Sequence, residues 1–99
     1  MRLTSSQIQV IKHKASEVFG DNANVYLFGS RLDDQARGGD IDLLIESKTT
    51  VERPAVLSSK LAAKVMIANN GLKVDVVLIA PNLSQQSIHK VALKTGVLL

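Results

Sequence analysis

Two aspartates separated by one residue, Asp40 and Asp42, stand at the start of an apolar run. On an extended strand, residues i and i+2 share one face, with their Cα atoms about 6.6 Å apart. In the expected strand 40–46, one face therefore carries Ile41, Leu43 and Ile45, and the other carries the two aspartates, Leu44 and Glu46. The carboxylates of Asp40 and Asp42 can therefore converge on one divalent ion or bridge two ions about 3.5–4 Å apart. Hard oxygen ligands favour Mg²⁺ or Mn²⁺, which keep part of their water shell and bind substrate phosphates. An isolated Asp-x-Asp pair is more often a solvated surface pair, so the neighbouring residues decide.

A Gly-Ser pair, Gly29-Ser30, ends an earlier apolar run, and nine residues separate the pair from Asp40. Glycine lets a ligand approach the backbone closely, and Ser30 offers a hydroxyl near backbone amides that attract anions. Arg31 and Arg37 lie between the two motifs. Gly-Ser alone is an ordinary turn, but beside the aspartate pair it indicates a phosphate-binding turn.

A third carboxylate, Asp75, interrupts the apolar run from Val74 to Leu78, which we expect to be buried. An unpaired charge in a buried strand is costly unless a partner or a metal compensates for it. If this strand lies beside the strand of Asp42, Asp75 can join the aspartate pair. The alternative is a salt bridge to a nearby arginine or lysine.

Hydrophobic periodicity predicts an α/β (α+β) domain in the order helix, strand, strand, helix, strand, helix. The expected strands are residues 24–28, 40–46 and 72–80; the expected helices are about 5–19, from Pro54 to a stop at 69–71, and from Ser84 to Gly96. A helical crossover makes the second and third strands parallel, and the short link allows the first two to be antiparallel. We therefore predict a single domain over residues 1–99, with a small mixed three-stranded sheet and flanking helices mainly on one face.

Local signals support both of the longer helices. Thr4 and Gln7 fit a capping box, and Gly20 is a natural residue at the end of the first helix. In the second, Leu57, Leu61 and Val65 (with Lys64 and Ala68) define the expected core-facing line, with Val56 and Ala63 beside it.

Composition sets the class of protein. The 99 residues are 45% hydrophobic and 21% charged, as in ordinary globular domains, and no cysteine is present to form disulfides or thiolate metal sites. No signal-peptide pattern or long apolar run occurs, so we expect a soluble, cytoplasmic protein without a membrane partner. The net charge of +3 comes from scattered basic residues, and only three residues are aromatic, so no strong nucleic-acid-binding signal exists. His13 and His89 lack metal-ligand spacing and are expected at the surface.

Taken together, Gly29-Ser30, Asp40-Ile41-Asp42-Leu43 and Asp75 resemble the nucleotidyltransferases of the DNA polymerase beta superfamily. The runs 28–31 and 37–45 are most similar to the minimal nucleotidyltransferase family, small proteins often paired with a HEPN-domain partner. The resemblance spans essentially the whole chain and implies a fold like the polymerase beta palm.

The resemblance also implies roles for the motif residues. Asp40, Asp42 and Asp75 would be catalytic and would hold Mg²⁺, as one or two ions, with Mn²⁺ able to substitute. Asp75 would also orient or deprotonate an attacking hydroxyl. The nucleotide phosphates would be bound by Gly29, Ser30, Arg31 and Arg37, although each arginine could equally be a surface or ion-paired residue. The implied reaction transfers a nucleoside monophosphate, AMP if the substrate is ATP, to a hydroxyl with release of pyrophosphate (EC 2.7.7.-).

The same resemblance implies a partner. Minimal members act as antitoxins of toxin–antitoxin pairs and can transfer AMP to a tyrosine of the HEPN toxin. A non-catalytic antitoxin that neutralises its partner sterically is the alternative, and transfer to a small molecule is a weaker one. The apolar tail, residues 97–99, could serve a protein interface or dock on the core.

Overall fold

The computed structural model of the chain describes residues 3–28, 41–69, 71, 73–83 and 94–99. Within them, the chain forms two helices and four strands, in the order α1 (Ser5–Phe19), β1 (Ala23–Phe28), β2 (Ile41–Ser47), α2 (Pro54–Ala68), β3 (Val74–Ile79) and β4 (Val97–Leu98). The expected last helix from Ser84 and the residue His89 fall largely or wholly outside the described residues. The two longer helices and the three predicted strands are confirmed, with strand ends that differ by one or two residues.

The strands form one mixed sheet in the order β3-β2-β1-β4. As predicted, β1 pairs antiparallel with β2, and β2 pairs parallel with β3. The predicted number of three strands is wrong, because the apolar tail adds β4 antiparallel to β1. The Leu99 amide also donates to the Val25 carbonyl at 2.8 Å, so the tail satisfies hydrogen bonds along the edge of β1.

Helix α1 begins and ends as its sequence predicts. The Thr4 hydroxyl accepts a hydrogen bond from the Gln7 amide at 3.1 Å, and the Gln7 side chain accepts one from the Thr4 amide at 2.8 Å. This reciprocal pair is the capping box, which satisfies two amides that the helix leaves free. At the other end Gly20 has φ 84, a conformation that is strained for residues with a Cβ. Ile11 and Ala15 are buried on the inner face.

Helix α2 follows its predicted line only in part. Leu61 and Val65 are fully buried and Leu57 is half-buried, as expected. Val56 and Ala63, expected beside the core, are instead exposed. The reason is that α2 is apolar around most of its circumference, so its sequence does not mark one face as the inner one.

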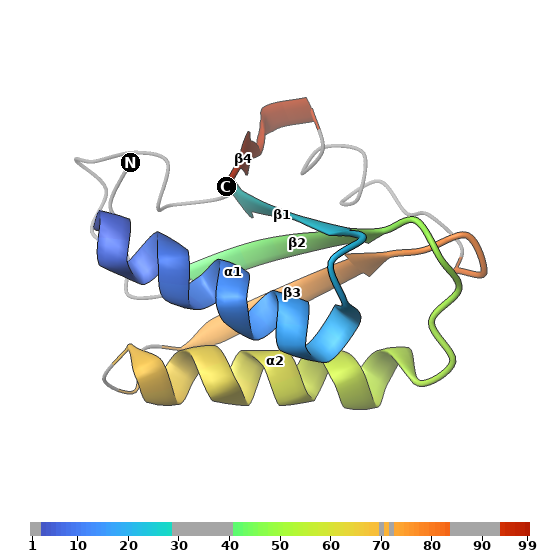
Figure 1. Cartoon of the computed structure of the whole chain (residues 1–99), viewed down its shortest axis with the longest axis horizontal. Coiled ribbons are helices and arrows are strands. Elements are labelled where there is room, and N and C mark those ends of the chain that lie inside the picture. The colour runs from blue at the N-terminus through green and yellow to red at the C-terminus, as the bar shows by residue number, and fades with distance from the viewer. Residues whose placement is uncertain (1–2, 29–40, 70, 72, 84–93) are drawn as a thin grey trace.

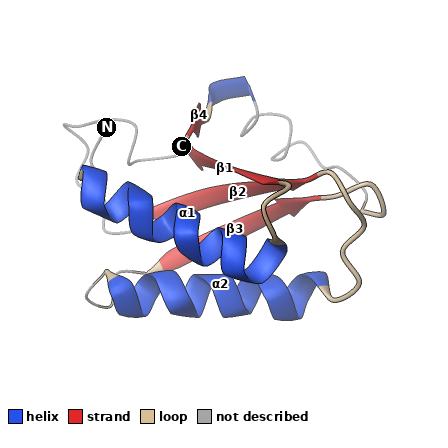
Figure 2. Ribbon diagram, in the orientation of Figure 1, coloured by secondary structure: helices blue, strands red, loops and turns tan. Residues whose placement is uncertain are grey.

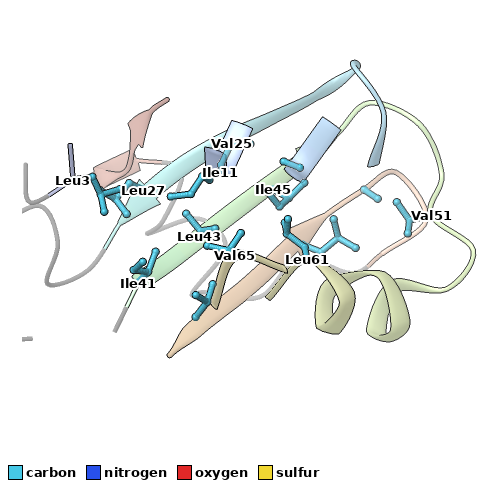
Figure 3. Close-up of a cluster of buried hydrophobic side chains, with 14 residues drawn as sticks. Leu3, Ile11, Val25, Leu27, Ile41, Leu43, Ile45, Val51, Leu61 and Val65 are labelled. Atoms are coloured by element: carbon cyan, nitrogen blue, oxygen red, sulfur yellow. The ribbon is translucent and has the colours of Figure 1, made fainter. Parts of the chain in front are cut away.

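Both helices pack on one face of the sheet (Figure 1; Figure 2). Figure 3 shows the core that results, where side chains of β1 and β2 meet those of α1 and α2. Its fully buried members are Ile11, Leu27, Ile41, Leu43, Ile45, Leu61 and Val65. On the opposite face of the sheet, Leu44 and Ile79 form a second, smaller cluster with Tyr26, Phe28 and Val77. Neither described helix is long and apolar enough to cross a bilayer.

Glu17 joins α1 to α2 through a small network of charges. Its carboxylate lies 3.2 Å from the Lys64 ammonium, 2.9 Å from His13 Nε2 and 3.9 Å from the Lys14 ammonium. The hydrogen bond from Lys64 is the main cause that lowers the pKa of Glu17, and the charges of Lys14 and His13 lower it further. As expected from the sequence, His13 is a surface residue.

We predict a pH-dependent contribution of Glu17 to stability. A carboxylate whose pKa is lowered by folding stabilises the folded state above its ordinary value of 4.5, and this contribution is lost as the pH falls through the lowered pKa. The Glu17→Gln variant should therefore have a lower free energy of unfolding than the parent protein at pH 7, and the difference should vanish in acid. Urea denaturation at pH 7, 5 and 3 measures it, with Glu52→Gln on the exposed segment before α2 as control. A difference that stays constant with pH would contradict the prediction.

Candidate functional site

Asp42 on β2 and Asp75 on β3 lie next to each other across two parallel strands. The register pairs Asp42 with Asp75 directly, and it pairs Asp42 with Phe28 on the other side. Because paired residues of neighbouring strands project to the same face, both carboxylates lie on one face of the sheet. The predicted adjacency of the second and third strands is confirmed, and it brings together two of the three aspartates.

This face is opposite to the one that the helices cover. Ile41, Leu43 and Ile45 belong to the core under the helices, so Asp42, Leu44 and Glu46 project to the other side. The end of β1, the start of β2 and the start of β3 meet at the same end of the sheet, as the register shows. A ligand held by Asp42 and Asp75 would therefore lie over one end of the sheet, away from α1 and α2.

The expected burial of Asp75 is wrong. Its side chain is 51% exposed, because it lies near the start of β3, an edge strand of the described sheet. Its carboxylate lies 4.0 Å from the Lys73 ammonium, itself 69% exposed, so the predicted alternative of a salt bridge to a nearby lysine is present. An exposed pair at this distance contributes little to stability. Asp75 therefore needs no metal to compensate for a buried charge, and the candidate site is supported instead by the register of Asp75 with Asp42.

The other predicted site residues, Gly29, Ser30, Arg31, Arg37 and Asp40, lie outside the described residues. In the sequence, Gly29 directly follows the last residue of β1 and Asp40 directly precedes the first residue of β2. These are the two strand ends that meet beside Asp42 and Asp75. The roles of these five residues stay predictions.

The donor atoms at this end of the sheet suit a hard divalent cation. Asp42 and Asp75 contribute carboxylate oxygens, which Mg²⁺ and Mn²⁺ prefer, and the chain has no cysteine to offer a softer ligand. No group of three potential ligands occurs among the described residues, a set that does not include Asp40. Of the three predicted ligands, Asp42 and Asp75 are adjacent in the described part of the sheet.

A second polar group lies farther along the same face and is partnered within the protein. Asn24 Nδ2 donates to Glu46 Oε1 at 3.3 Å. Burial raises the pKa of Tyr26, and the charge of Glu46 and a hydrogen bond to it raise the pKa further. Tyr26 therefore stays protonated at neutral pH. The sequence correctly placed Glu46 on the same face as Asp42. It did not predict that Asn24 and Tyr26 would form hydrogen bonds with the Glu46 carboxylate.

A model of one protein family, described as "Nucleotidyltransferase domain", matches residues 8–99. The chain belongs to this family. The match includes all the described strands, both aspartates and the two predicted motifs. The α/β fold, with two helices and a mixed sheet, is consistent with the family. Among curated proteins, none shows significant similarity to the chain.

Membership of the family gives the site its general chemistry. A nucleotidyltransferase domain transfers a nucleoside monophosphate from a nucleoside triphosphate, and members of the family typically use a divalent metal. The nucleotidyltransferase described here has two carboxylates on one face of its sheet, at the end where β2 and β3 begin.

Proposed function

We propose that this protein transfers AMP from ATP to a hydroxyl of a partner protein, in a Mg²⁺-dependent reaction. The proposed acceptor is a tyrosine of a HEPN-domain toxin, which makes the protein the antitoxin of a cytoplasmic toxin–antitoxin pair. The observation that carries the proposal is the direct pairing of Asp42 with Asp75 in a chain that matches the nucleotidyltransferase family over residues 8–99. Support for the HEPN partner is the similarity of residues 28–31 and 37–45 to minimal nucleotidyltransferases.

The proposed reaction is an in-line displacement at the α-phosphorus of ATP. The acceptor oxygen forms a bond to the α-phosphorus, and the bond from that phosphorus to the oxygen bridging to the β-phosphate breaks. Pyrophosphate leaves with the electron pair, and the acceptor hydroxyl loses its proton. Asp75, whose side chain is half exposed on the sheet face, would orient the hydroxyl and accept this proton.

Asp40, Asp42 and Asp75 would hold the metal, and Gly29, Ser30, Arg31 and Arg37 would hold the phosphates. Bound Mg²⁺ would neutralise charge on the triphosphate and the leaving pyrophosphate. Most of the remaining rate enhancement would come from positioning the acceptor oxygen behind the α-phosphorus. These residue roles belong to the proposal.

We expect the purified protein to label the protein encoded by the adjacent gene when both are incubated with Mg²⁺ and ATP labelled at the α-phosphate. Mass spectrometry of the labelled protein should find AMP on a tyrosine. ATP labelled at the γ-phosphate is the matched control and should give no label, because pyrophosphate leaves. Label from the γ-phosphate would identify a kinase reaction and contradict the proposal.

A steric antitoxin is the second candidate, and exposed apolar residues on α2 favour a protein-binding role of this kind. The Asp40→Asn/Asp42→Asn double variant separates the two candidates, since it should remove transfer without changing the protein's surface elsewhere. If transfer neutralises the toxin, cells that carry the toxin should not survive with this variant. Full protection by the double variant would establish the steric reading instead.

A further inference from the structure

Helix α2 carries a stripe of apolar side chains on its outer face. Val56, Met66 and Ile67 are 59%, 39% and 78% exposed. Val56, Ala63 and Ile67 are spaced seven and four residues apart, so they lie along one side of the helix, and Met66 flanks them. In Figure 1, α2 runs along the lower edge of the molecule, with the sheet and α1 on its other side. We refer to Val56, Ala63, Met66 and Ile67 as the α2 stripe.

The α2 stripe is unusual for the outer face of a helix that packs on a sheet. Such helices normally turn polar residues to the solvent. Helix α1 does so, since Gln9, Lys12 and His13 occupy exposed positions on it. Exposed apolar side chains that gather on one face of a protein commonly mark a site of interaction.

The charges on α2 restrict what can cover the stripe. The helix contains Lys60 and Lys64 and no acidic residue. Lys64 is paired with Glu17 of α1, whereas Lys60 is exposed on the same side of the helix as the stripe, four residues after Val56 and seven before Ile67. A symmetric pair of two α2 helices would bring the Lys60 side chains of both copies into one interface with no carboxylate from either helix. Charge complementarity therefore favours a different protein that supplies acidic side chains.

We propose that the α2 stripe docks an amphipathic helix of a partner protein, whose apolar residues are flanked by carboxylates. The partner's apolar side chains would pack on Val56, Ala63 and Ile67, and a flanking carboxylate would pair with Lys60. Helices that pair in this way combine an apolar seam with charged flanking positions that select the partner.

The position of the stripe makes docking compatible with the candidate active site. The stripe lies on the helical layer, and Asp42 and Asp75 lie on the opposite face of the sheet. A partner bound to α2 would leave the face of the two aspartates uncovered. The inference does not rest on the proposed transfer reaction, because an assembly surface on α2 would serve a catalytic or a steric antitoxin equally.

A pair of synthetic helical peptides tests the proposal with the whole protein. Both peptides carry leucine at the seam positions of about three heptads. At the flanking positions, one peptide has glutamate and the other has lysine. The like charges within each peptide keep it from pairing with itself. We expect the glutamate peptide to bind and the lysine peptide to bind at least about tenfold more weakly. Equal binding of the two peptides, or no binding of the glutamate peptide, would overturn the proposal.

Substitutions locate the binding on α2. Val56→Gln and Ile67→Gln should each weaken binding of the glutamate peptide about tenfold, the cost of losing one apolar anchor. Lys60→Glu should reverse the preference between the two peptides. Leu98→Gln, on β4 and 58% exposed, is the matched control and should bind like the parent protein. An equal loss in Leu98→Gln would overturn the assignment to α2.

Two other occupants would show in parallel measurements on the same variants. Sedimentation would reveal a homodimer that Ile67→Gln dissociates, and flotation with phosphatidylglycerol vesicles would reveal a lipid surface bound through the stripe. Either result would overturn the proposal in favour of a second copy or a membrane. If the parent protein binds the glutamate peptide but does not transfer AMP, the result would contradict the proposed function and leave the docking proposal intact.

Discussion

Replacing Asp42 with asparagine is expected to lower kcat for AMP transfer by about 10³-fold, the scale on which loss of one electrostatic stabiliser slows an enzyme. The side chain keeps its size, so the packing around β2 should not change. Only the negative charge that would hold the metal is removed. Single-turnover measurement of pyrophosphate release in the presence of the acceptor protein gives the rate, and circular dichroism checks the fold.

Glu46 provides the matched control for this experiment. It lies four residues after Asp42 on the same strand and the same face, and its carboxylate interacts with Asn24 and Tyr26. Glu46→Gln removes an equal charge from the same strand, so it corrects for any general effect of charge on nucleotide binding. We expect it to retain kcat within a few-fold. Similar losses in Asp42→Asn and Glu46→Gln would contradict a metal site at the start of the strand.

Asp75 extends the test to the neighbouring strand. If it accepts the proton, Asp75→Asn should lower kcat more than it raises KM for ATP, because the interaction develops in the transition state. Lys73→Met is the control, because it removes the same weak ion pair and leaves the Asp75 carboxylate in place. Lys73→Met with normal kcat and Asp75→Asn with low kcat together would support a catalytic role for the carboxylate.

Much of the arrangement around these aspartates is predictable from the sequence because it depends on local signals. The alternation in 41–46 correctly assigned Ile41, Leu43 and Ile45 to the core and Asp42 to the other face. The helix between the second and third strands correctly implied a parallel pair, which is what sets Asp42 beside Asp75. Thus the parallel direction of the two strands follows from local signals, whereas the register that aligns Asp42 with Asp75 comes from the structure.

What the sequence missed depends on contacts between distant segments. The exposure of Asp75 follows from its place on an edge strand, and a run of valines around it reads the same at the edge or at the centre of a sheet. The pairing of Val97 and Leu98 with β1 joins residues about seventy positions apart, which no local pattern encodes. The outward direction of Val56 was missed because α2 is apolar on both sides.

Replacing Leu61 with alanine is expected to lower the free energy of unfolding by about 2–5 kcal/mol, the range for a buried leucine whose loss leaves a cavity. Leu61 is fully buried in the core between α2 and the sheet, where it lies among the side chains shown in Figure 3. Domains of this size are stable by about 5–15 kcal/mol, so the loss is a large fraction of the total. Urea denaturation measures the shift in midpoint.

Val56→Ala on the same helix is the control, and it should change stability by no more than about 0.5 kcal/mol because the side chain is 59% exposed. The same substitution should weaken binding of the glutamate peptide. The two faces of α2 would then be separated by measurement: Leu61 contributes to folding and not directly to docking, and Val56 contributes to docking and little to folding. A strongly destabilised Val56→Ala variant would mean that the outer stripe is covered by the protein itself, and it would contradict both the exposure of Val56 and the docking surface built on it.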